Sequence, residues 1–374
     1  MVGAQMPNAG GSTMRSTRTH WVLSPAVLPA VLSAVLLLAL PAVTACGGGG
    51  SGAGAPTASP AASPPAEPKA GATIGVFQYG PDPSTKAAYD GLLEGLAEAG
   101  YVEGENLTVD FRDCGGDQAT IEATAREFAA AGLDAVVPLT TPCLVAAATY
   151  VKDTPVVFTS VYDPMAAGVA ASPEDHPANL TGVYSPPPVE ATVALIASWL
   201  PDVRVVGTAY NPDEANSSSA VARMGEACAA HGRRLAKLTV RSAADVAPGL
   251  EAFLGGGQQA GGAGDPGVLY VTGDNTVMGE FAAVARLARR AGVPLFINDV
   301  SFVGRGAVAG LGPDFAHAGV AGGRLLARVL DGADPASLPL HLDDATLLSV
   351  NEAAARAVGL EIPEAVRDRA TSVQ

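Results

Sequence analysis

Several polar residues stand directly after apolar runs, and one group, Thr140-Thr141-Pro142, has the chemistry of a carboxylate receptor. A hydroxyl at a helix start, followed by proline in the first turn, leaves backbone N–H groups there without partners inside the helix. Such N–H groups bind anions. Most Thr-Pro helix starts are caps and nothing more, so the ordinary interpretation stays open beside the functional one.

Two acidic residues stand at the ends of neighbouring predicted strands in the second half of the chain. Asp274 follows the run 267–272 (GVLYVT), and Asp299 follows 294–298 (PLFIN). Two carboxylates at adjoining strand ends would pair with an ammonium group. Aspartate at such positions is at least as often a helix cap. Together with the helix start at Thr140, the pair predicts a site for a small zwitterion, most simply an amino acid.

The remaining candidate ligand-binding residues lie in the other loops that follow predicted strands, where parallel sheets bind their ligands. These residues are Gln78, Tyr79, Asp163, Asn211, Asn216, Asn275 and Thr276. Asp163 precedes a proline and is equally consistent with a turn that touches no ligand.

No catalytic or metal-binding motif is present in the sequence. It has no Gly-x-Ser-x-Gly elbow, no phosphate loop, and no His-x-x-x-His or Cys-x-x-Cys spacing. We therefore expect no metal, no cofactor and no enzymatic activity. An anchored hydrolase that uses Asp274 and Asp299 as a carboxylate pair remains an alternative.

Three cysteines follow Cys46 in the chain. Cys114 and Cys143 both stand just past predicted strands, and a disulfide between them requires their Cα atoms to lie about 4.4–6.8 Å apart. An exported protein permits such a bond, so the sequence leaves the bridged and the reduced states open. Cys228 shares an apolar stripe with Val221 and Met224, which predicts a buried free thiol.

Short β-branched runs alternate with helical periodicity from residue 72 onward, which predicts βαβ units and parallel sheets covered on both faces. We expect strands at 73–79, 106–112, 134–139, 155–161, 203–210, 235–240, 267–272, 294–298 and 308–312. We expect helices from Tyr89 toward Gly100 and at 118–131, 142–152, 188–200, 217–231, 243–254, 277–291 and 351–358.

About 300 residues exceed what one core usually holds, and Pro186-Pro187-Pro188 interrupts the alternation. The sequence therefore predicts two doubly wound parallel-sheet lobes, divided near 181–188, with a cleft between them. Ligands in such sheets lie beyond the carboxyl ends of the strands, so the cleft is where a ligand would be held.

The first 45 residues have the profile of a lipoprotein signal peptide. Arg15 and Arg18 precede an uncharged apolar run, 21–45, that ends in small residues before Cys46. We expect Cys46 to be lipidated and residues 46–70, rich in Gly, Ser, Ala and Pro, to be a flexible linker. An uncleaved membrane-spanning anchor is the alternative.

Charge excludes one class of partner. The 374 residues carry 22 Lys and Arg against 37 Asp and Glu, a net charge of −15. A protein that binds nucleic acid needs a basic surface, so we expect no nucleic-acid partner.

Several motifs, agreeing in order, resemble the ABC-transporter substrate-binding proteins of the tryptophan/tyrosine-type family. They are 210–217 (YNPDEANS), 274–277 (DNTV), Thr141-Pro142, Asp163-Pro164 followed by Ala167-Gly168, and 101–104 (YVEG) with Asn106. The resemblance implies a type I periplasmic-binding-protein fold with three crossovers between lobes and an aromatic amino acid as ligand. It also implies that 71–183 with 299–330 form the first lobe, and 184–298 with 331–374 the second.

The resemblance further implies residue roles. Thr141 would receive the ligand carboxylate, Asp274 and Asp299 would face the ammonium group, and Asn211, Asn216 and Asn275 would add hydrogen bonds. The chain departs from the family at Tyr79-Gly80-Pro81, where family members often have a histidine-proline pair, so its side-chain pocket is expected to differ.

The sequence therefore predicts a monomeric, lipid-anchored solute receptor on the outer face of the cell membrane. It would close around a small zwitterion, which the resemblance implies is an aromatic amino acid, and deliver it to an ABC permease. The alternative is a ligand-sensing module that reports to a membrane signalling partner.

Overall fold

The computed structural model describes residues 70–255 and 265–374. The predicted signal peptide, Cys46 and residues 46–69 of the predicted linker lie outside the described residues. Every described residue belongs to one compact unit. Within the two described ranges, no helix is both long enough and apolar enough to cross a membrane.

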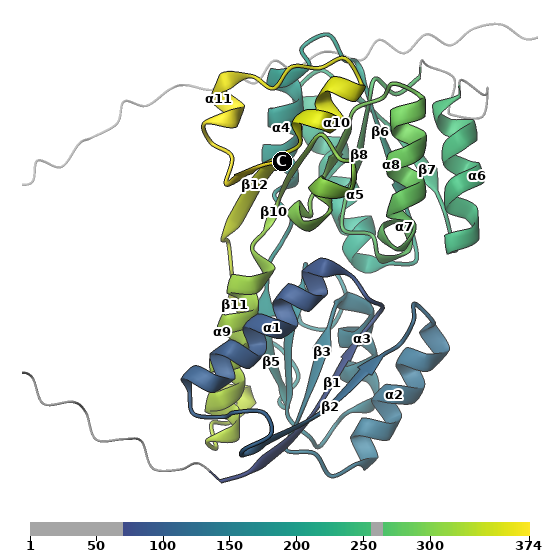
Figure 1. The fold of residues 1–374 in the computed structure, drawn as a ribbon. Helices are drawn as coiled ribbons and strands as arrows, with labels where there is room; N and C mark the ends of the chain where they lie inside the picture. Colours follow the sequence, from purple (N-terminus) through teal and green to yellow (C-terminus); the bar gives the residue numbers. More distant parts are fainter. Residues whose placement is uncertain (1–69, 256–264) are drawn as a thin grey trace, which may run out of the picture. The chain divides into compact units, whose positions relative to one another are not determined.

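The first sheet has six parallel strands in the order β11-β5-β4-β3-β1-β2 (Figure 1). Its elements are β1 (Ala72–Gln78), α1 (Pro83–Glu98), β2 (Leu107–Asp113), α2 (Gln118–Ala130), β3 (Ala135–Leu139), α3 (Thr141–Tyr150), β4 (Val156–Val161) and β5 (Leu180–Tyr184), joined later in the chain by α9 (Phe315–Leu330), η2 (Pro335–Ser337) and β11 (His341–Leu342). We call this sheet and its helices the first lobe.

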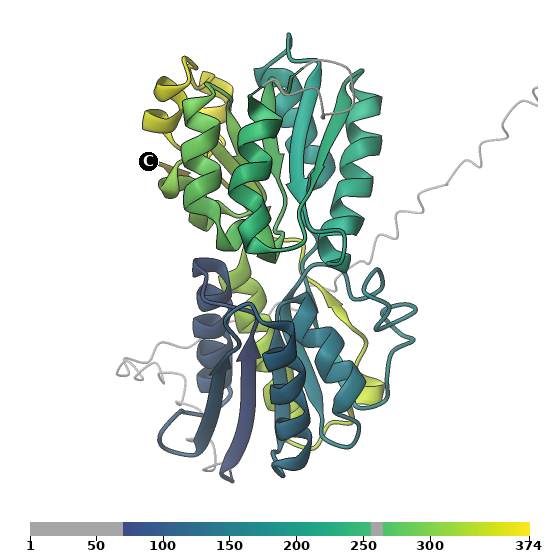
Figure 2. The same cartoon turned by 90° about the vertical axis from the view of Figure 1, so that its right-hand side faces the viewer.

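Helices cover both faces of the first sheet, as its strand composition requires. Strand β1 is apolar on both sides: Ile74 and Val76 pack with Leu92 and Leu326 beneath α1 and α9, whereas Phe77 packs beneath α2 and α3. The sequence of a strand that is buried on both faces is a nearly continuous apolar run. The predicted doubly wound arrangement is confirmed for this lobe (Figure 2).

The second sheet has seven strands in the order β13-β12-β10-β9-β8-β6-β7, parallel except where β12 pairs antiparallel with β10. The elements of this second lobe are α4 (Val189–Trp199), β6 (Val205–Tyr210), α5 (Ala215–Ala230), β7 (Arg234–Thr239), α6 (Ala243–Leu254), β8 (Val268–Val271), α7 (Asn275–Gly279), α8 (Phe281–Arg290), β9 (Leu295–Ile297), η1 (Val300–Arg305), β10 (Ala309–Pro313), β12 (Thr346–Val350), α10 (Glu352–Ala357), α11 (Glu364–Arg367) and β13 (Ser372–Val373). It also has one apolar cluster on each face.

The chain passes between the two sheets three times: after β5, after β10 and after β11. These positions correct the expected boundaries at 299 and 331. Residues 299–313 stay with the second sheet, because β10 pairs with β9 and β12. Residues 331–342 stay with the first sheet, because β11 pairs with β5. The whole of 299–330 was expected in the first lobe, but α9 is the only element of this segment that lies there.

Helix α9 was not predicted as a separate helix, and it packs closely on α1. Gly91 and Gly95 on α1 face Gly319 and Gly323 on α9, and a Cβ atom at any of the four positions would overlap the backbone of the other helix. Small residues at i and i+4 on both helices permit this close approach, as they do in other tight helix pairs. The pairing attaches the segment after the second crossover to the first lobe.

Both sheets share one strand order, which determines where a ligand can lie. In the first sheet β1 has β2 on one side and β3 on the other, and in the second sheet β6 lies between β7 and β8. In the first sheet, the loops after β1 and β3 therefore turn to opposite faces. In the second sheet, the loops after β6 and β8 do the same. The crevice at such a switch point is the usual ligand site of open α/β sheets.

Candidate functional site

A cavity of about 910 Å³ lies at the carboxyl ends of both sheets. Its walls come mainly from the loops that follow β1, β2, β3 and β4 of the first lobe and β6, β7, β8 and β9 of the second. These loops include both switch points. The predicted cleft between two lobes is therefore present in the structure.

The cavity brings together ten of the twelve predicted ligand-binding residues. They are Tyr79, Thr140, Thr141, Pro142, Asn211, Asn216, Asp274, Asn275, Thr276 and Asp299. Gln78 and Asp163 are outside the wall. The Gln78 amide donates to Asp113 at 2.7 Å, and the Asp163 carboxylate accepts from the N–H groups of Met165 and Ala166. Asp163 is thus the turn residue of the alternative interpretation.

The first turn of α3 presents unused donors to the cavity. Thr140 precedes the helix but its side chain makes no capping hydrogen bond, and its buried Oγ1 has no partner among the described residues. Pro142 has no N–H, so the turn offers the amides of Thr141 and Cys143. By contrast, Asp82 caps α1 and Asp117 caps α2. An uncapped first turn favours a bound anion.

Backbone strain is concentrated at this cavity. Thr140 and Ser160 have φ values of 81° and 57°, in the region that favours glycine, and both line the cavity. Non-glycine residues in such conformations cost about 1–3 kcal/mol each and cluster at ligand sites. The strained backbone at Thr140 aims the start of α3 into the cavity.

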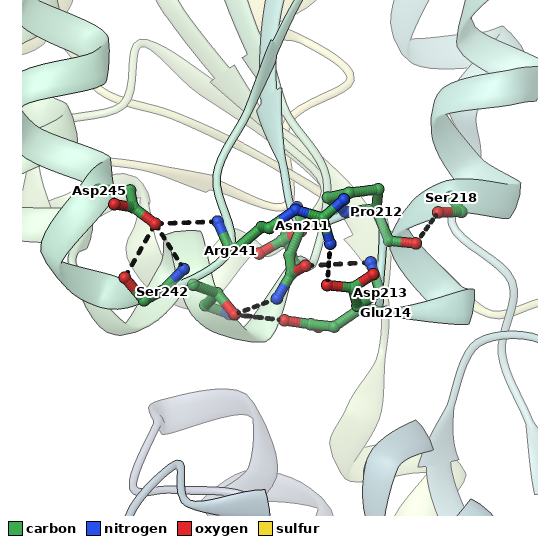
Figure 3. Close-up of polar contacts among 10 residues, drawn as sticks. Asn211, Pro212, Asp213, Glu214, Ser218, Arg241, Ser242 and Asp245 are labelled. Atoms are coloured by element: carbon green, nitrogen blue, oxygen red, sulfur yellow. Dashed lines mark hydrogen bonds and ion pairs between the residues drawn. The ribbon is translucent and has the colours of Figure 1, made fainter.

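In the second lobe, the start of α5 has a similar character. Glu214 precedes α5 but does not cap it, and the side-chain Oδ1 of Asn216 is buried without a partner in the described part of the chain. Figure 3 shows the Glu214 side chain turned instead toward the start of α7. There Glu214 accepts from the backbone N–H groups of Asn275 and Thr276, at 2.8 and 2.9 Å.

Asp274 is the helix cap of the alternative interpretation, because its side chain caps α7. Its side chain is fully buried and accepts from the Asn211 N–H at 2.5 Å, the Ser217 hydroxyl at 2.6 Å and the Val277 N–H at 2.8 Å. Burial, with the Glu214 carboxylate nearby, raises the pKa of Asp274 to about 7. Because internal donors occupy both oxygens, Asp274 fastens α7 to the loop after β6. The expected contact between Asp274 and a ligand ammonium is not supported.

Asp299 differs from Asp274 in what its oxygens contact. It precedes η1, accepts from the Ser301 N–H at 2.9 Å and lies near the hydroxyls of Ser301 and Ser84. The Ser84 hydroxyl donates to the Asp82 carboxylate at 2.5 Å. Burial raises the pKa of Asp299, and the neighbouring Asp82 carboxylate adds to the effect. A cation placed here would relieve both effects. Asp299 is therefore the carboxylate best suited to an ammonium group.

Aromatic side chains from both lobes line the cavity. Tyr79, Tyr162 and Phe315 come from the first lobe and Phe302 from the second. The rings of Tyr162 and Phe315 stack with centroids 6.0 Å apart at an angle of 22°. Trp199 is elsewhere, packed on Phe296 in the core of the second lobe. The cavity thus offers an apolar surface near its polar helix starts.

The cavity wall is strongly acidic. Its carboxylates belong to Asp82, Asp213, Glu214, Asp274, Glu280 and Asp299, against the two guanidinium groups of Arg241 and Arg305. Arg241 forms an ion pair with Asp213 at the edge of the second lobe (Figure 3). An excess of carboxylates disfavours a purely anionic ligand.

The two lobes touch beside the cavity. The Tyr162 ring of the first lobe lies against Gly273 of the second, where a Cβ atom would overlap the tyrosine hydroxyl. The Ser219 hydroxyl donates to the Asp163 carboxylate at 3.3 Å. The Tyr79 hydroxyl is hydrogen-bonded to Thr276, and burial raises the pKa of this tyrosine. These contacts join the two lobes in this structure.

Cys114 and Cys143 are free thiols in the structure, and Cys228 is the buried free thiol that the sequence predicts. A hydrogen bond from Cys143 lowers the pKa of Cys114 to about 7, while burial raises the pKa of Cys143. The two thiols therefore lie in contact without a bond between them. In the described ranges, no group of three or more His, Cys, Asp or Glu side chains is placed to hold a metal ion.

Several cavity residues were not singled out from the sequence, among them Ser160, Arg241, Glu280, Arg305 and Phe315. Arg305 ends η1, and Phe315 starts α9, whose return to the first lobe was placed too early. Asp82, Tyr162 and Phe302 lie within the loops expected to form the site. The signal that could have marked Asp82 is the Asp82-Pro83 pair, a typical helix start.

A family model described as ABC transporter substrate binding protein matches residues 73–374. A curated tyrosine-binding protein of Clostridioides difficile is 26% identical over 77% of this chain and 81% of its own length. A solved Vibrio cholerae conserved domain protein is 35% identical, with a TM-score of 0.76 over 81% of this chain and 99% of that one. A Streptococcus pneumoniae ABC domain in complex with L-Trp is 28% identical, with a TM-score of 0.76 over 82% of this chain and 100% of that one.

Proposed function

Because this chain belongs to the ABC transporter substrate-binding protein family, we propose that it captures an aromatic amino acid between its two lobes and releases it to a membrane permease. Members of the family bind solutes outside the cytoplasm, work with an ABC permease and are not enzymes. The observation that carries the proposal is the cavity, which has unpaired amide donors on one lobe and a buried carboxylate on the other.

The first turn of α3 would hold the ligand carboxylate. The amides of Thr141 and Cys143 are available there, and the Thr140 hydroxyl is buried without a partner in the described structure. A hydrogen bond to a charged group contributes about 1.5–3 kcal/mol in a buried site. Two amides and a hydroxyl could therefore supply a large part of the binding free energy.

Asp299 of the second lobe would hold the ammonium group. Its carboxylate is buried, and its pKa is raised because the charge has lost water without gaining a cation. A ligand ammonium group would supply that cation. Since the two charged ends of one small molecule would then be bound by different lobes, the ligand would favour the closed arrangement over the open one.

The aromatic walls would accept the ligand side chain. Tyr79, Tyr162, Phe302 and Phe315 present rings to the cavity, and pairs of rings contribute about 0.5–1.5 kcal/mol beyond the area they bury. The tyrosine-binding and L-Trp-bound relatives point to the same ligand class. Tyr79, which stands where histidine-proline is expected in the family, would shape the side-chain pocket of this member.

We further propose that the mature protein is a monomer held at the outer face of the membrane by lipidated Cys46. This part of the proposal is supported by the sequence, in which an apolar run and small residues precede Cys46 and a Gly- and Pro-rich segment follows it. Mass spectrometry of the protein purified from membranes tests it. A diacylglyceryl group on Cys46 is expected, and an N-terminus upstream of Cys46 would contradict the proposal.

Isothermal titration calorimetry with L-tryptophan, L-tyrosine and L-phenylalanine tests the ligand class. Tryptamine, which lacks the carboxylate, and indole-3-propionate, which lacks the ammonium group, test the two charged ends separately. We expect at least one of the three amino acids to bind and both indole analogues to bind at least about tenfold more weakly than tryptophan. Absence of binding by all three amino acids would reject the proposal.

A further inference from the structure

A second hollow, of about 360 Å³, lies on the second lobe between α8, the end of η1 and α10. Three arginines line it: Arg286 and Arg289, one turn apart on α8, and Arg305 at the end of η1. None of its lining residues is acidic. We call this hollow the arginine groove.

The three arginines have no carboxylate partner in the described ranges, although the protein carries 37 acidic residues against 22 basic ones. Nearby arginines are paired: Arg290 with Glu251, and Arg356 with Glu352. The Arg305 guanidinium lies 4.9 Å from the centroid of the Phe302 ring, which leaves its N–H groups unused. Three unpaired guanidinium groups around one hollow, on an acidic protein, favour an anion there.

The floor of the arginine groove is apolar and made of small side chains. Alanines of α8 and α10 provide most of it: Ala282, Ala285, Ala288, Ala353, Ala354 and Ala357. Small side chains leave the hollow open between the two helices. An occupant that combined an anionic group with a short apolar body would match both the rim and the floor.

We propose that the arginine groove binds a phosphate ester, with the phosphate held by Arg286, Arg289 and Arg305 and the ester carbons lying on the alanine floor. A guanidinium group binds oxyanions through paired N–H groups. A carboxylate has two oxygens to share among three such groups, whereas a phosphate monoester has three terminal oxygens and up to two charges. A soluble metabolite or the headgroup of phosphatidic acid, which is also a phosphate monoester, would provide the same chemistry.

Two probes distinguish these sources. Both are applied to the compact unit that contains all the described residues and lacks the apolar leader. Glycerol 3-phosphate, titrated by calorimetry at low salt, tests a soluble ester. Flotation with vesicles that contain phosphatidic acid tests the headgroup. The test variant is Arg286→Gln/Arg289→Gln, which spares Arg305 because that residue also lines the ligand cavity. The matched control, Arg328→Gln/Arg369→Gln, removes the same charge from exposed positions outside the groove.

We expect at least one probe to bind the unaltered protein, with affinity that falls as salt is added. The groove variant is expected to bind that probe about tenfold more weakly or worse, and the control variant to bind it unchanged. Melting temperature and tryptophan binding should be the same in all three proteins. Binding of neither probe, or an equal loss in both variants, would overturn the proposal.

Discussion

Asp274 and Asp299 stand at matching places in the sequence, each just after a strand of the second lobe, yet their surroundings give them different roles. Three internal donors occupy Asp274, and the pKa of its carboxyl is raised to about 7 mainly by burial. Asp299 lies between the lobes beside Asp82 and Ser84. Residue type and spacing predicted both residues correctly as members of the cavity wall. They did not predict that internal donors would occupy both oxygens of Asp274.

Asp299→Asn is therefore expected to weaken binding of the amino acid by about tenfold or more, because an amide does not compensate an ammonium charge. Its folding stability should be equal to or above that of the unaltered protein, since a buried charge is removed. Calorimetric titration and a thermal melt measure the two effects. Asp213→Asn is the control, because Asp213 lines the same cavity but is exposed and paired with Arg241. Unchanged binding in Asp299→Asn would refute the assigned role.

The raised pKa of Asp274 predicts how stability changes with pH. The folded protein binds this proton more tightly than the unfolded chain does, whose carboxyl has the ordinary pKa near 3.8. The contribution of Asp274 to the free energy of unfolding is therefore expected to fall as pH rises from about 4 to about 7, by at most about 1.4 kcal/mol per pH unit, and then to level off. Urea unfolding at pH 5, 6 and 7 measures the slope.

The matching variant for this pH series is Asp274→Asn, which has no proton to exchange at this position. Its unfolding free energy should be lower overall, because an amide cannot accept all three hydrogen bonds of Asp274. Its slope between pH 5 and 7 should be more positive than that of the unaltered protein. Identical slopes in the two proteins would show that Asp274 does not titrate as described.

At the scale of elements, periodicity predicted most strands to within two residues and failed where local signals were weak. Strand β5 was not predicted because Leu180–Tyr184 is short and runs directly into a proline-rich crossover. Helix α9 was not predicted as a helix because its three glycines lower its helix propensity. Gly319 and Gly323 are explained by their contact with α1, and Gly322 lies against Thr159 of β4. Local helix propensity does not take such tertiary contacts into account.

Gly323→Ala is expected to destabilise the protein by about 1–3 kcal/mol, because the new methyl group would meet the backbone of α1. Gly225→Ala is the matched control. That glycine is also inside a helix, α5, but the nearest neighbour of an added Cβ is a side-chain atom of Leu235 at 3.8 Å. The control should gain up to about 1 kcal/mol from helix propensity. Denaturant unfolding compares the two, and an equal effect of both would contradict the tight packing of α1 on α9.

At the scale of the whole molecule, the alternation of strands and helices was sufficient to predict an α/β fold with two sheets and a cavity at their carboxyl ends. The crossover positions were predicted less well. The expectation that 299–330 belongs to the first lobe failed because β10 pairs with β9, a strand of only three residues, and with β12, which lies far from β10 in sequence. Long-range pairing of this kind leaves little local signal.

Closure of the two lobes is expected to require glycine at position 273. Gly273→Ala would place a methyl group on the Tyr162 ring and prevent the lobes from meeting, at a cost of about 1–3 kcal/mol in the closed state. Small-angle scattering with and without L-tryptophan should show a decrease in radius of gyration in the unaltered protein and a smaller one in the variant.

Gly279→Ala provides the control for this experiment. Gly279 lines the same cavity, but no atom lies within 4 Å of an added Cβ. The control should close and bind as the unaltered protein does. If Gly273→Ala also closed and bound normally, the contact between Tyr162 and Gly273 would have no part in closure.

A crystal structure of the protein grown with L-tryptophan tests the central claim most directly. The account predicts one molecule in the cavity, with its carboxylate at the amides of Thr141 and Cys143 and its ammonium group at Asp299. Density for the amino acid outside this cavity, or in it with the ammonium group turned away from Asp299, would contradict the account.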